Sequence, residues 1–353
     1  MRSRLRFWKY PIFIVLLLLV IAAFTLVYAL SDTAAAPYER IENDDPVIME
    51  TPEPPDEPDE PDITDESEDE PEDEPEEEPV HNPIDDGFII IDMDEADIHR
   101  GPLILVNFEN EYKIPEDLDL VNIVEAKSSP YRVQIDNFRL ARSIIEPLDD
   151  MMNAFISATG NRSVAIISAF RTLNNQQTIL NNYISRMGRR QALRWAALPG
   201  HSEHHTGLAF DFGILSGGVR TTFDGTGSTA WFRRNSYRFG FIHRFARDKT
   251  HITQTEHEPW HFRYVGLPHS RIMFQENWCF EEYHEILRNE HPFETPYEFE
   301  HDGVNYWIYF VEGTEIKLPL NCEFDISGNN IDGFIVTAII FDYDSSIPVE
   351  IYI

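Results

Sequence analysis

Cysteine and basic residues are scarce in this chain of 353 residues. Two cysteines are too few for a disulfide-dense scaffold or a cysteine-rich metal site. Lys and Arg total 28 against 62 Asp and Glu, which gives a formal net charge of −34. Nucleic-acid binding depends on neutralising phosphates with Lys and Arg, so we expect no nucleic-acid partner. Hydrophobic residues nevertheless make up 42% of the chain, enough for one large domain or two smaller ones.

The N-terminus combines basic residues with a long apolar segment. Residues 12–30 contain Thr25 as their one clearly polar member and follow a flank that is rich in arginine. A spanning helix needs about 20 apolar residues, whereas the core of a signal peptide needs about 7–15. The length favours an uncleaved signal anchor within residues 1–31, with the basic flank in the cytoplasm. We therefore expect a single-pass protein of the cell membrane whose remainder is extracellular, on the cell-wall side. The small residues at 33–36 leave a cleaved signal peptide as the alternative.

An acidic, proline-rich segment follows. Residues 41–80 carry 21 acidic side chains, no basic one and nine prolines. Such a composition cannot bury a core, and both proline and like-charge repulsion extend the chain. We expect residues 32–96 to form a disordered stalk.

The rest of the chain shows a mixture of helical and strand patterns, typical of an α+β fold. Alternating or short apolar runs predict strands or extended segments, whereas apolar residues at helical spacing predict helices. The expected strands or extended segments are 88–91, 103–106, 164–168, 208–212, 239–243, 260–265, 306–311, 316–318, 333–341 and 349–353, and the expected helices are 131–159, 176–197 and 280–287.

Histidines cluster between residues 201 and 269, in two segments that also hold carboxylates. A catalytic zinc takes three nitrogen or oxygen ligands and keeps one position open for water, and His204, Asp211 and His261 offer such a set. Glu258 lies three residues before His261, where its carboxylate could take a proton from a metal-bound water. Each motif is weak alone, because a histidine beside Trp260 is more often a packed core residue than a ligand.

Three segments, in this order along the chain, resemble the zinc D-alanyl-D-alanine carboxypeptidases of the VanY type. They are Ser168-Ala169-Phe170-Arg171-Thr172 with Gln176, residues 202–211 (SEHHTGLAFD) and residues 258–266 (EPWHFRYVG). The resemblance covers about residues 100–290. It implies an α+β fold with an antiparallel sheet floor and flanking helices, of the zinc D-Ala-D-Ala peptidase/hedgehog-like type. It also implies one Zn²⁺ per chain and peptidase action on peptidoglycan stem peptides.

The resemblance also implies roles for individual residues. His204, Asp211 and His261 would be the zinc ligands, and Glu258 would be the general base. Arg171 would hydrogen-bond the scissile carbonyl, as a fixed cation aimed at a developing oxyanion does. Gln176 and Ser202 would position the substrate. A surface ion pair is the alternative for Arg171.

His205 departs from the family, which usually has glutamine at this position. A second histidine beside a ligand could compete for metal, although adjacent residues of a strand point to opposite faces. His201 and His257, which flank the motifs, are interpreted as residues of loops or of the rim of the site.

Residues 97–290 are therefore expected to form the catalytic domain, and residues 291–353 a small β-rich extension. About 60 residues are marginal for an independent core, so the extension more simply covers one side of the catalytic domain than forms a wall-binding module. Cys279 and Cys322 could tie the two parts together by a disulfide or remain two buried thiols.

The sequence thus predicts a membrane-anchored zinc D,D-carboxypeptidase that removes the terminal D-Ala from peptidoglycan stems. Three alternatives remain: an L,D-carboxypeptidase acting on tetrapeptide stems, a peptidoglycan endopeptidase, and a non-catalytic wall-binding module. The presence of Glu258 argues against the last of these, because a binding module needs no base.

Overall fold

The computed structural model describes residues 87–217, 219–320 and 322–340. The signal anchor predicted within residues 1–31, most of the acidic stalk and the strand predicted at 349–353 lie outside these residues. Among the residues that the structure describes, no helix is both long and apolar enough to cross a membrane.

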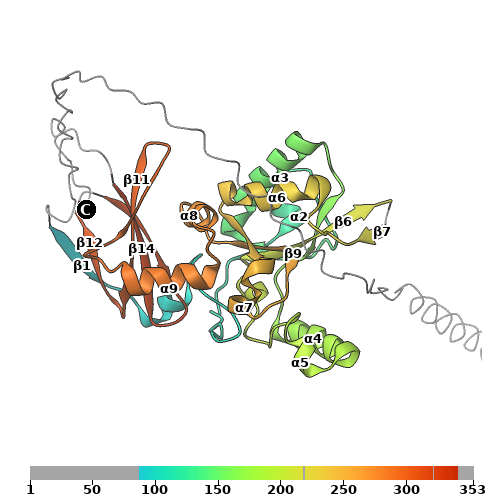
Figure 1. Cartoon of the computed structure of the whole chain (residues 1–353), viewed down its shortest axis with the longest axis horizontal. Coiled ribbons are helices and arrows are strands. Elements are labelled where there is room, and N and C mark those ends of the chain that lie inside the picture. The colour runs from blue at the N-terminus through green and yellow to red at the C-terminus, as the bar shows by residue number, and fades with distance from the viewer. Residues whose placement is uncertain (1–86, 218, 321, 341–353) are drawn as a thin grey trace, which may run out of the picture. The chain divides into compact units, whose positions relative to one another are not determined.

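A six-stranded sheet forms the centre of the first part of the fold (Figure 1). Its strands, in spatial order, are β3 (Arg132–Val133), β5 (Val164–Ser168), β6 (Ala209–Ser216), β9 (Glu258–Tyr264) and β8 (Phe241–Phe245). The sixth strand, β7 (Val219–Thr221), pairs with the end of β6. Every pair is antiparallel except β3 with β5, which is parallel. The α+β expectation with a largely antiparallel sheet is therefore confirmed.

Helices and aromatic residues cover one face of this sheet. The core on that face joins the helices α3 (Ile145–Thr159) and α6 (Ala230–Asn235) to phenylalanines of β6 and β9. Phe155 of α3 packs with its ring centroid 4.3 Å from that of Phe232 in α6, and Phe232 lies 4.4 Å from Phe212 of β6. This packing leaves the opposite face of the central strands for polar side chains.

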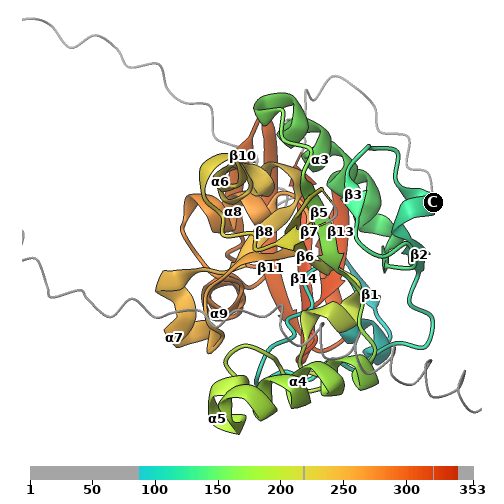
Figure 2. The ribbon, with the colours of Figure 1, turned by 90° about the vertical axis from the view of Figure 1, so that its right-hand side faces the viewer.

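Two predicted helices have different bounds in the structure. The segment 131–144 forms β3, β4 (Arg139–Ala141) and a short 3₁₀ turn, and α3 begins only at Ile145; β4 pairs instead with β2 (Leu120–Asn122). The helix predicted at 176–197 is α4 (Leu173–Met187) followed by the short α5 (Arg189–Ala192). Gly188, with φ of 79°, separates them, because glycine adopts positive φ at little cost. The two helices lie side by side in both views (Figures 1 and 2).

The C-terminal extension contains a four-stranded antiparallel sheet. Its order is β10 (Tyr297–His301), β11 (Val304–Glu312), β14 (Gly333–Ile340) and β13 (Glu323–Gly328), and α9 (Phe280–Glu290) precedes it. Apolar side chains of β11, β14 and α9 share one core with Leu103 and Leu105 from the start of the catalytic region. The extension has a second apolar cluster, around Tyr309, Phe334 and Val336, to which Ile98 also belongs. The core shared with Leu103 and Leu105 favours the interpretation in which the extension covers one side of the catalytic domain.

The folded part begins earlier than the expected boundary at residue 97. β1 (Phe88–Asp92) pairs antiparallel with β12 (Glu315–Pro319) of the extension, and the two strands lie side by side in Figure 1. The segment 103–106, predicted as a strand or extended segment, belongs to no strand: Leu103 lies in a turn and the other three residues have no regular structure. The remaining short elements are η3 (Glu95–His99), α2 (Ile123–Ala126), η4 (Arg142–Ile144), η5 (Glu203–Thr206), η6 (Gly227–Thr229), η7 (Ser236–Phe239), η8 (Arg247–Lys249), α7 (Thr250–Thr253) and α8 (His269–Gln275).

The two cysteines have separate partners. Cys279 is buried at the N-cap of α9, where its side chain accepts a hydrogen bond from the helix backbone. The Cys322 thiol donates a hydrogen bond to the carbonyl of Leu320, with Sγ 3.4 Å from the oxygen. These contacts favour two thiols over the disulfide.

Candidate active site

Two adjacent strands place Asp211 and His261 on the polar face of the central sheet. Successive side chains of a strand point to opposite faces. In β6, Phe210 and Phe212 enter the aromatic core, and so does Phe262 in β9, which turns Asp211 and His261 to the other side. The two residues face each other directly in the register of β6 and β9, and His261 Nδ1 lies 3.0 Å from Asp211 Oδ1.

His204 reaches the same place from the loop before β6. It belongs to the 3₁₀ turn η5, which ends at Gly207 in the left-handed conformation, with φ of 73°. A Cβ at position 207 would lie 2.5 Å from a methyl group of Leu120, so this sharp entry into β6 requires glycine. His204 Nε2 lies 3.4 Å from Asp211 Oδ1. One donor atom from each of His204, Asp211 and His261 lies within 4.8 Å of the others, and all three residues are buried.

These three residues fit a catalytic zinc site. Two imidazoles and one carboxylate are typical donors of such a site, and three protein ligands leave a fourth position for water or substrate. The structure thus brings together the three predicted metal ligands, which come from three different elements. His261 follows Asp211 by 50 residues in the sequence.

Glu258 stands at the first position of β9, beside these donors. It is 8% exposed, and its Oε2 lies 3.8 Å from His261 Nδ1. Burial raises the pKa of Glu258 to about 8, and the nearby charge of Asp211 also raises it, although His261 acts in the opposite direction. A carboxyl beside a metal site, with its pKa near neutrality, can take up a proton and return it.

Arg171 is held on the opposite side of Asp211. Its guanidinium donates to Asp211 Oδ2 at 2.7 Å and to Ser168 Oγ at 2.7 and 3.0 Å. The pairing of β5 with β6 places Ser168 directly beside Asp211. The side chain of Arg171 is only 19% exposed, so its ion pair with Asp211 is not the surface pair considered as the alternative.

Gln176 lies on the first turns of α4 and contacts Arg171. Its Oε1 accepts a hydrogen bond from Arg171 Nη1 at 3.2 Å, and its Nε2 donates to the carbonyl of Ala197 at 2.9 Å. Gln176 is 1% exposed. Both functional atoms of its amide are therefore engaged within the protein, so that Gln176 supports Arg171.

The neighbouring histidines do not join the donor set. His205 is fully buried; its Nδ1 lies 2.7 Å from the carbonyl oxygen of Arg171, and its Nε2 lies 3.2 Å from the backbone nitrogen of Gly200. His201 and His257 each contact a backbone carbonyl, of Asn107 and of Phe245. His205 thus joins two loops of the site, in place of competing for a metal.

One cavity of about 400 Å³ collects all seven residues that the sequence singled out. Ser202, which is 6% exposed, contributes to its wall together with Arg171, Gln176, Glu258 and the three donors. Sequence reasoning missed the aromatic walls of the cavity, which are formed by Phe108, Tyr183, Phe245 and Trp260, and the basic residues Arg190 and Arg194.

Sequence reasoning also missed the buried ionic residues behind the donors. Glu203 stands in a segment that carries the family resemblance and Arg244 stands between two such segments, but nothing in their spacing indicates a role. The structure places them in contact: Arg244 Nε donates to Glu203 Oε1 at 2.8 Å, and Glu203 Oε2 lies 3.1 Å from His261 Nε2. For Arg244, the available signal was a charged residue among the apolar residues of β8 (FIHRF).

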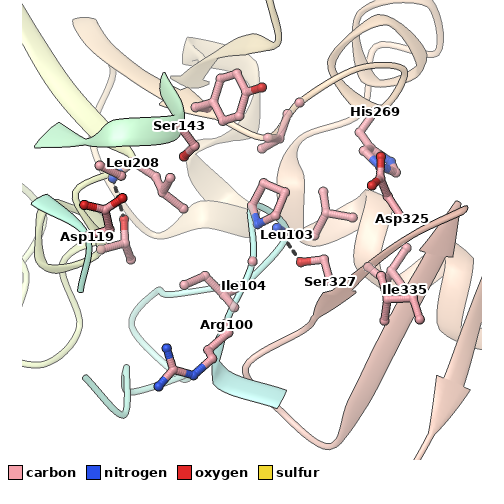
Figure 3. A pocket seen from close by; sticks show the side chains of 18 of the residues that line it. Arg100, Leu103, Ile104, Asp119, Ser143, Leu208, His269, Asp325, Ser327 and Ile335 are labelled. Atoms are coloured by element: carbon pink, nitrogen blue, oxygen red, sulfur yellow. Dashed lines mark hydrogen bonds between the residues drawn. The ribbon is translucent and has the colours of Figure 1, made fainter. Parts of the chain in front are cut away.

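A second cavity, of about 570 Å³, lies where β13 and β14 approach the first part of the fold (Figure 3). Asp325, Ser327 and Ile335 line it from these strands, and Arg100 and Asp119 line it from the N-terminal side. None of the seven predicted site residues lines this cavity. The chemistry predicted from the sequence therefore belongs to the smaller cavity.

The match to known proteins agrees with this site. The model of the VanY family, described as D-alanyl-D-alanine carboxypeptidase, matches residues 137–267. A D-alanyl-D-alanine carboxypeptidase of Enterococcus faecium is 32% identical over 251 residues, which cover 69% of this chain and 77% of that protein. The chain belongs to the VanY family.

Further relatives of this VanY-family chain extend the match. A D-alanyl-D-alanine carboxypeptidase of Enterococcus faecalis is 33% identical over 204 residues, covering 54% of this chain and 68% of that protein. The solved structure of the vancomycin-resistance D,D-dipeptidase VanXYg, in complex with a D-Ala-D-Ala phosphinate analog, has a TM-score of 0.64 at 35% identity and covers 72% of this chain and 99% of that one. The protein is therefore a peptidase, and all seven site residues fall inside the segment that the family model matches.

Proposed function

We propose that this protein is a zinc-dependent D,D-carboxypeptidase that removes the terminal D-Ala from peptidoglycan stem peptides. The observation that carries the proposal is the single cavity in which His204, Asp211 and His261 present their donor atoms beside Glu258 and Arg171. The similarity to D-alanyl-D-alanine carboxypeptidases of Enterococcus supports the substrate class. The polar face of a largely antiparallel sheet supports a fold of the zinc D-Ala-D-Ala peptidase/hedgehog-like type.

His204, Asp211 and His261 would hold the zinc ion. When bound, zinc polarises a carbonyl and lowers the pKa of a nearby water, which makes hydroxide available near neutral pH. Glu258 accepts the proton from the water that attacks the scissile carbonyl carbon. It then gives this proton to the nitrogen of the leaving D-Ala as the C–N bond breaks, so that its carboxylate is regenerated.

Arg171 would stabilise the negative charge that develops on the carbonyl oxygen. Its guanidinium is fixed by Asp211, Ser168 and Gln176 before substrate arrives, so little reorganisation is needed during the reaction. Ser202, which lines the cavity, would hydrogen-bond the free carboxylate of the substrate.

The proposal is tested with defined peptides and mass spectrometry. The full-length protein, purified in detergent and loaded with zinc, is incubated separately with stem pentapeptide, tetrapeptide and tripeptide and with a cross-linked stem dimer. We expect loss of one D-Ala from the pentapeptide alone, and loss of this activity after chelation with recovery on adding zinc. Cleavage of the tetrapeptide would indicate an L,D-carboxypeptidase, cleavage of the dimer an endopeptidase, and no cleavage a binding module.

A D,D-dipeptidase is the second candidate function. The similarity to VanXYg, which covers 99% of that D,D-dipeptidase, favours it. Free D-Ala-D-Ala therefore belongs in the same assay. Comparable kcat/KM for the dipeptide and the pentapeptide would support a bifunctional enzyme.

We further propose that the catalytic domain is held outside the cell by the apolar segment at residues 12–30. The basis is the length of that segment and its basic flank. Membrane fractionation followed by carbonate extraction tests this: the protein should stay in the pellet, whereas a cleaved signal peptide would release a shorter soluble form.

A further inference from the structure

Glu203 is a buried carboxylate directly behind one of the proposed metal ligands. It is 3% exposed, and its Oε2 lies 3.1 Å from His261 Nε2, while the other ring nitrogen of His261 lies 3.0 Å from Asp211 Oδ1. The imidazole therefore spans the gap between two carboxylates. We infer that Glu203 is a positioning residue that holds His261 with its proton on Nε2, so that the lone pair of Nδ1 faces the metal site. This inference rests on the proposed zinc function.

His204 shows the same principle with the opposite nitrogen. Its Nδ1 lies 2.8 Å from the carbonyl oxygen of Ala169. A carbonyl oxygen accepts hydrogen bonds and never donates them, so Nδ1 carries the proton and Nε2 is left with its lone pair toward Asp211. The two ligand histidines thus use different nitrogens, and in each case the acceptor behind the ring selects the tautomer.

The acceptor behind His261 is a full charge, fixed by an ionic network. Arg244 Nε donates to Glu203 Oε1 at 2.8 Å, and Arg263 Nη1 lies 3.6 Å from the same oxygen. The two arginine side chains are completely buried. Since Oε1 is held by arginines, Oε2 remains for the ring of His261.

Glu281 of α9 balances the charges of this network. It accepts two hydrogen bonds from Arg244, at 2.8 and 2.5 Å. The buried Glu203 and the partly buried Glu281 thereby face two buried arginines, and buried charges are tolerated when they are paired in this way. A guanidinium only donates hydrogen bonds, so the contacts of Arg244 and Arg263 with Oε1 are those that a carboxylate makes.

The short turn η5 contributes two residues to the proposed metal site. Glu203 and His204 are neighbours in η5, and His204 supplies one ligand while Glu203 orients another ligand, on β9. A carboxylate that accepts the outer N–H of a ligand histidine fixes the ring and makes its other nitrogen a stronger donor. Removing such a partner costs about 10- to 100-fold in metal affinity.

The test is the zinc affinity of Glu203→Gln, measured in the full-length protein by competition with a chromophoric chelator. Glutamine keeps the size of the side chain and one acceptor oxygen but removes the charge. We expect affinity to fall about 10- to 100-fold relative to the unmodified protein. Asp149→Asn is the matched control: Asp149 is also a buried carboxylate, 5% exposed, but it bonds Ser128 and none of the proposed ligands. The zinc affinity of Asp149→Asn should stay within about threefold of that of the unmodified protein, even if the Tm of this variant falls.

A second measurement keeps the inference open to refutation if Glu203→Gln fails to fold. Nitrogen-15 NMR of histidine-labelled unmodified protein reports the tautomer of each ring, and His261→Asn identifies the resonance of His261. A proton on Nε2 of His261 supports the inference, and a proton on Nδ1 overturns it. Equal zinc affinity of Glu203→Gln and the unmodified protein also overturns it, and leaves the proposed function intact. Failure of the unmodified protein to bind zinc would instead reject the proposed function, and this inference with it.

Discussion

Arg171 donates a hydrogen bond of 2.7 Å to the carboxylate of Asp211, one of the three proposed metal ligands. The guanidinium therefore lies beside the metal site before any substrate is present. Gln176 holds Arg171 from the other side through a 3.2 Å hydrogen bond. From these contacts we expect Arg171 to bind the substrate directly and Gln176 to act only by holding Arg171 in place.

We predict that Arg171→Ala lowers kcat about 10²- to 10³-fold, the usual effect of removing an oxyanion donor. Gln176→Ala should lower kcat/KM about five- to tenfold, since a hydrogen bond of this kind contributes about 1 kcal/mol. In the Arg171→Ala background, Gln176→Ala should add little. Steady-state kinetics of the single and double variants measure this. Multiplicative effects would show that Gln176 touches the substrate itself, as the family resemblance implies.

His205 offers a test of loop positioning. Its ring joins the carbonyl of Arg171 to the backbone N–H of Gly200. A glutamine side chain offers one acceptor and a donor group and can make both bonds. We predict that His205→Gln keeps kcat/KM within about threefold. His205→Leu leaves both backbone groups unpaired and should cost about 1–3 kcal/mol of unfolding free energy.

Thermal unfolding and peptide kinetics of the two His205 variants decide the point. If His205→Gln were as inactive as His205→Leu, the imidazole itself would be required. Holding the two loops together would then not explain the role of His205.

Removing one proposed ligand should empty the metal site. His261→Ala leaves only His204 and Asp211, and two ligands do not make a stable zinc site of this kind. We expect less than one tenth of a zinc per chain after dialysis, measured by elemental mass spectrometry. His257→Ala is the control, because His257 contacts the carbonyl of Phe245 and none of the donors, and it should retain one zinc. Full zinc occupancy in His261→Ala would contradict the ligand assignment.

Glu258→Gln should separate metal binding from catalysis. The amide is of equal size but takes up no proton, so zinc should remain bound while turnover falls about 10²- to 10⁴-fold. Zinc content and kcat are measured on the same preparation. Loss of the metal in this variant would make Glu258 a ligand.

The mode of cleavage can be tested by amidating the C-terminus of a stem pentapeptide. An exopeptidase recognises a free carboxylate one residue beyond the scissile bond. The acidic chain repels anions in general, so recognition depends on groups within the cavity, where Arg171 and Ser202 lie. We expect kcat/KM for the amide to be at least about tenfold lower than for the acid, or about 1.4 kcal/mol in transition-state binding. Equal values would favour an endopeptidase.

Much of the site was readable from the sequence because its chemistry resides in residue types at short spacings. The strand containing Asp211 and the strand containing His261 were predicted to within a few residues, since both are short apolar runs bounded by loop residues. Alternation along these strands then places ligands on one face and phenylalanines on the other.

The helix predicted at 131–159 was wrong over residues 131–144, for a physical reason, and right over α3. Apolar residues at 131–144 have helical spacing, but Leu140 and Val121 pair in register on β4 and β2, and strand 132–133 joins β5. Backbone hydrogen bonds to strands distant in sequence form in this segment, and they outweigh the helical tendency that the spacing of apolar residues indicates.

The sequence by itself determined the family and the class of reaction, and it predicted the metal ligands and the acidic N-terminal stalk. These properties depend on residue types and on composition, both of which can be read from short segments of the sequence. Only the tertiary structure showed that Gln176 contacts Arg171, that Glu203 contacts His261, and that β1 pairs with β12 more than 200 residues away. Buried ion pairs and strand pairs form between residues that the fold brings together, so their partners leave no pattern along the chain.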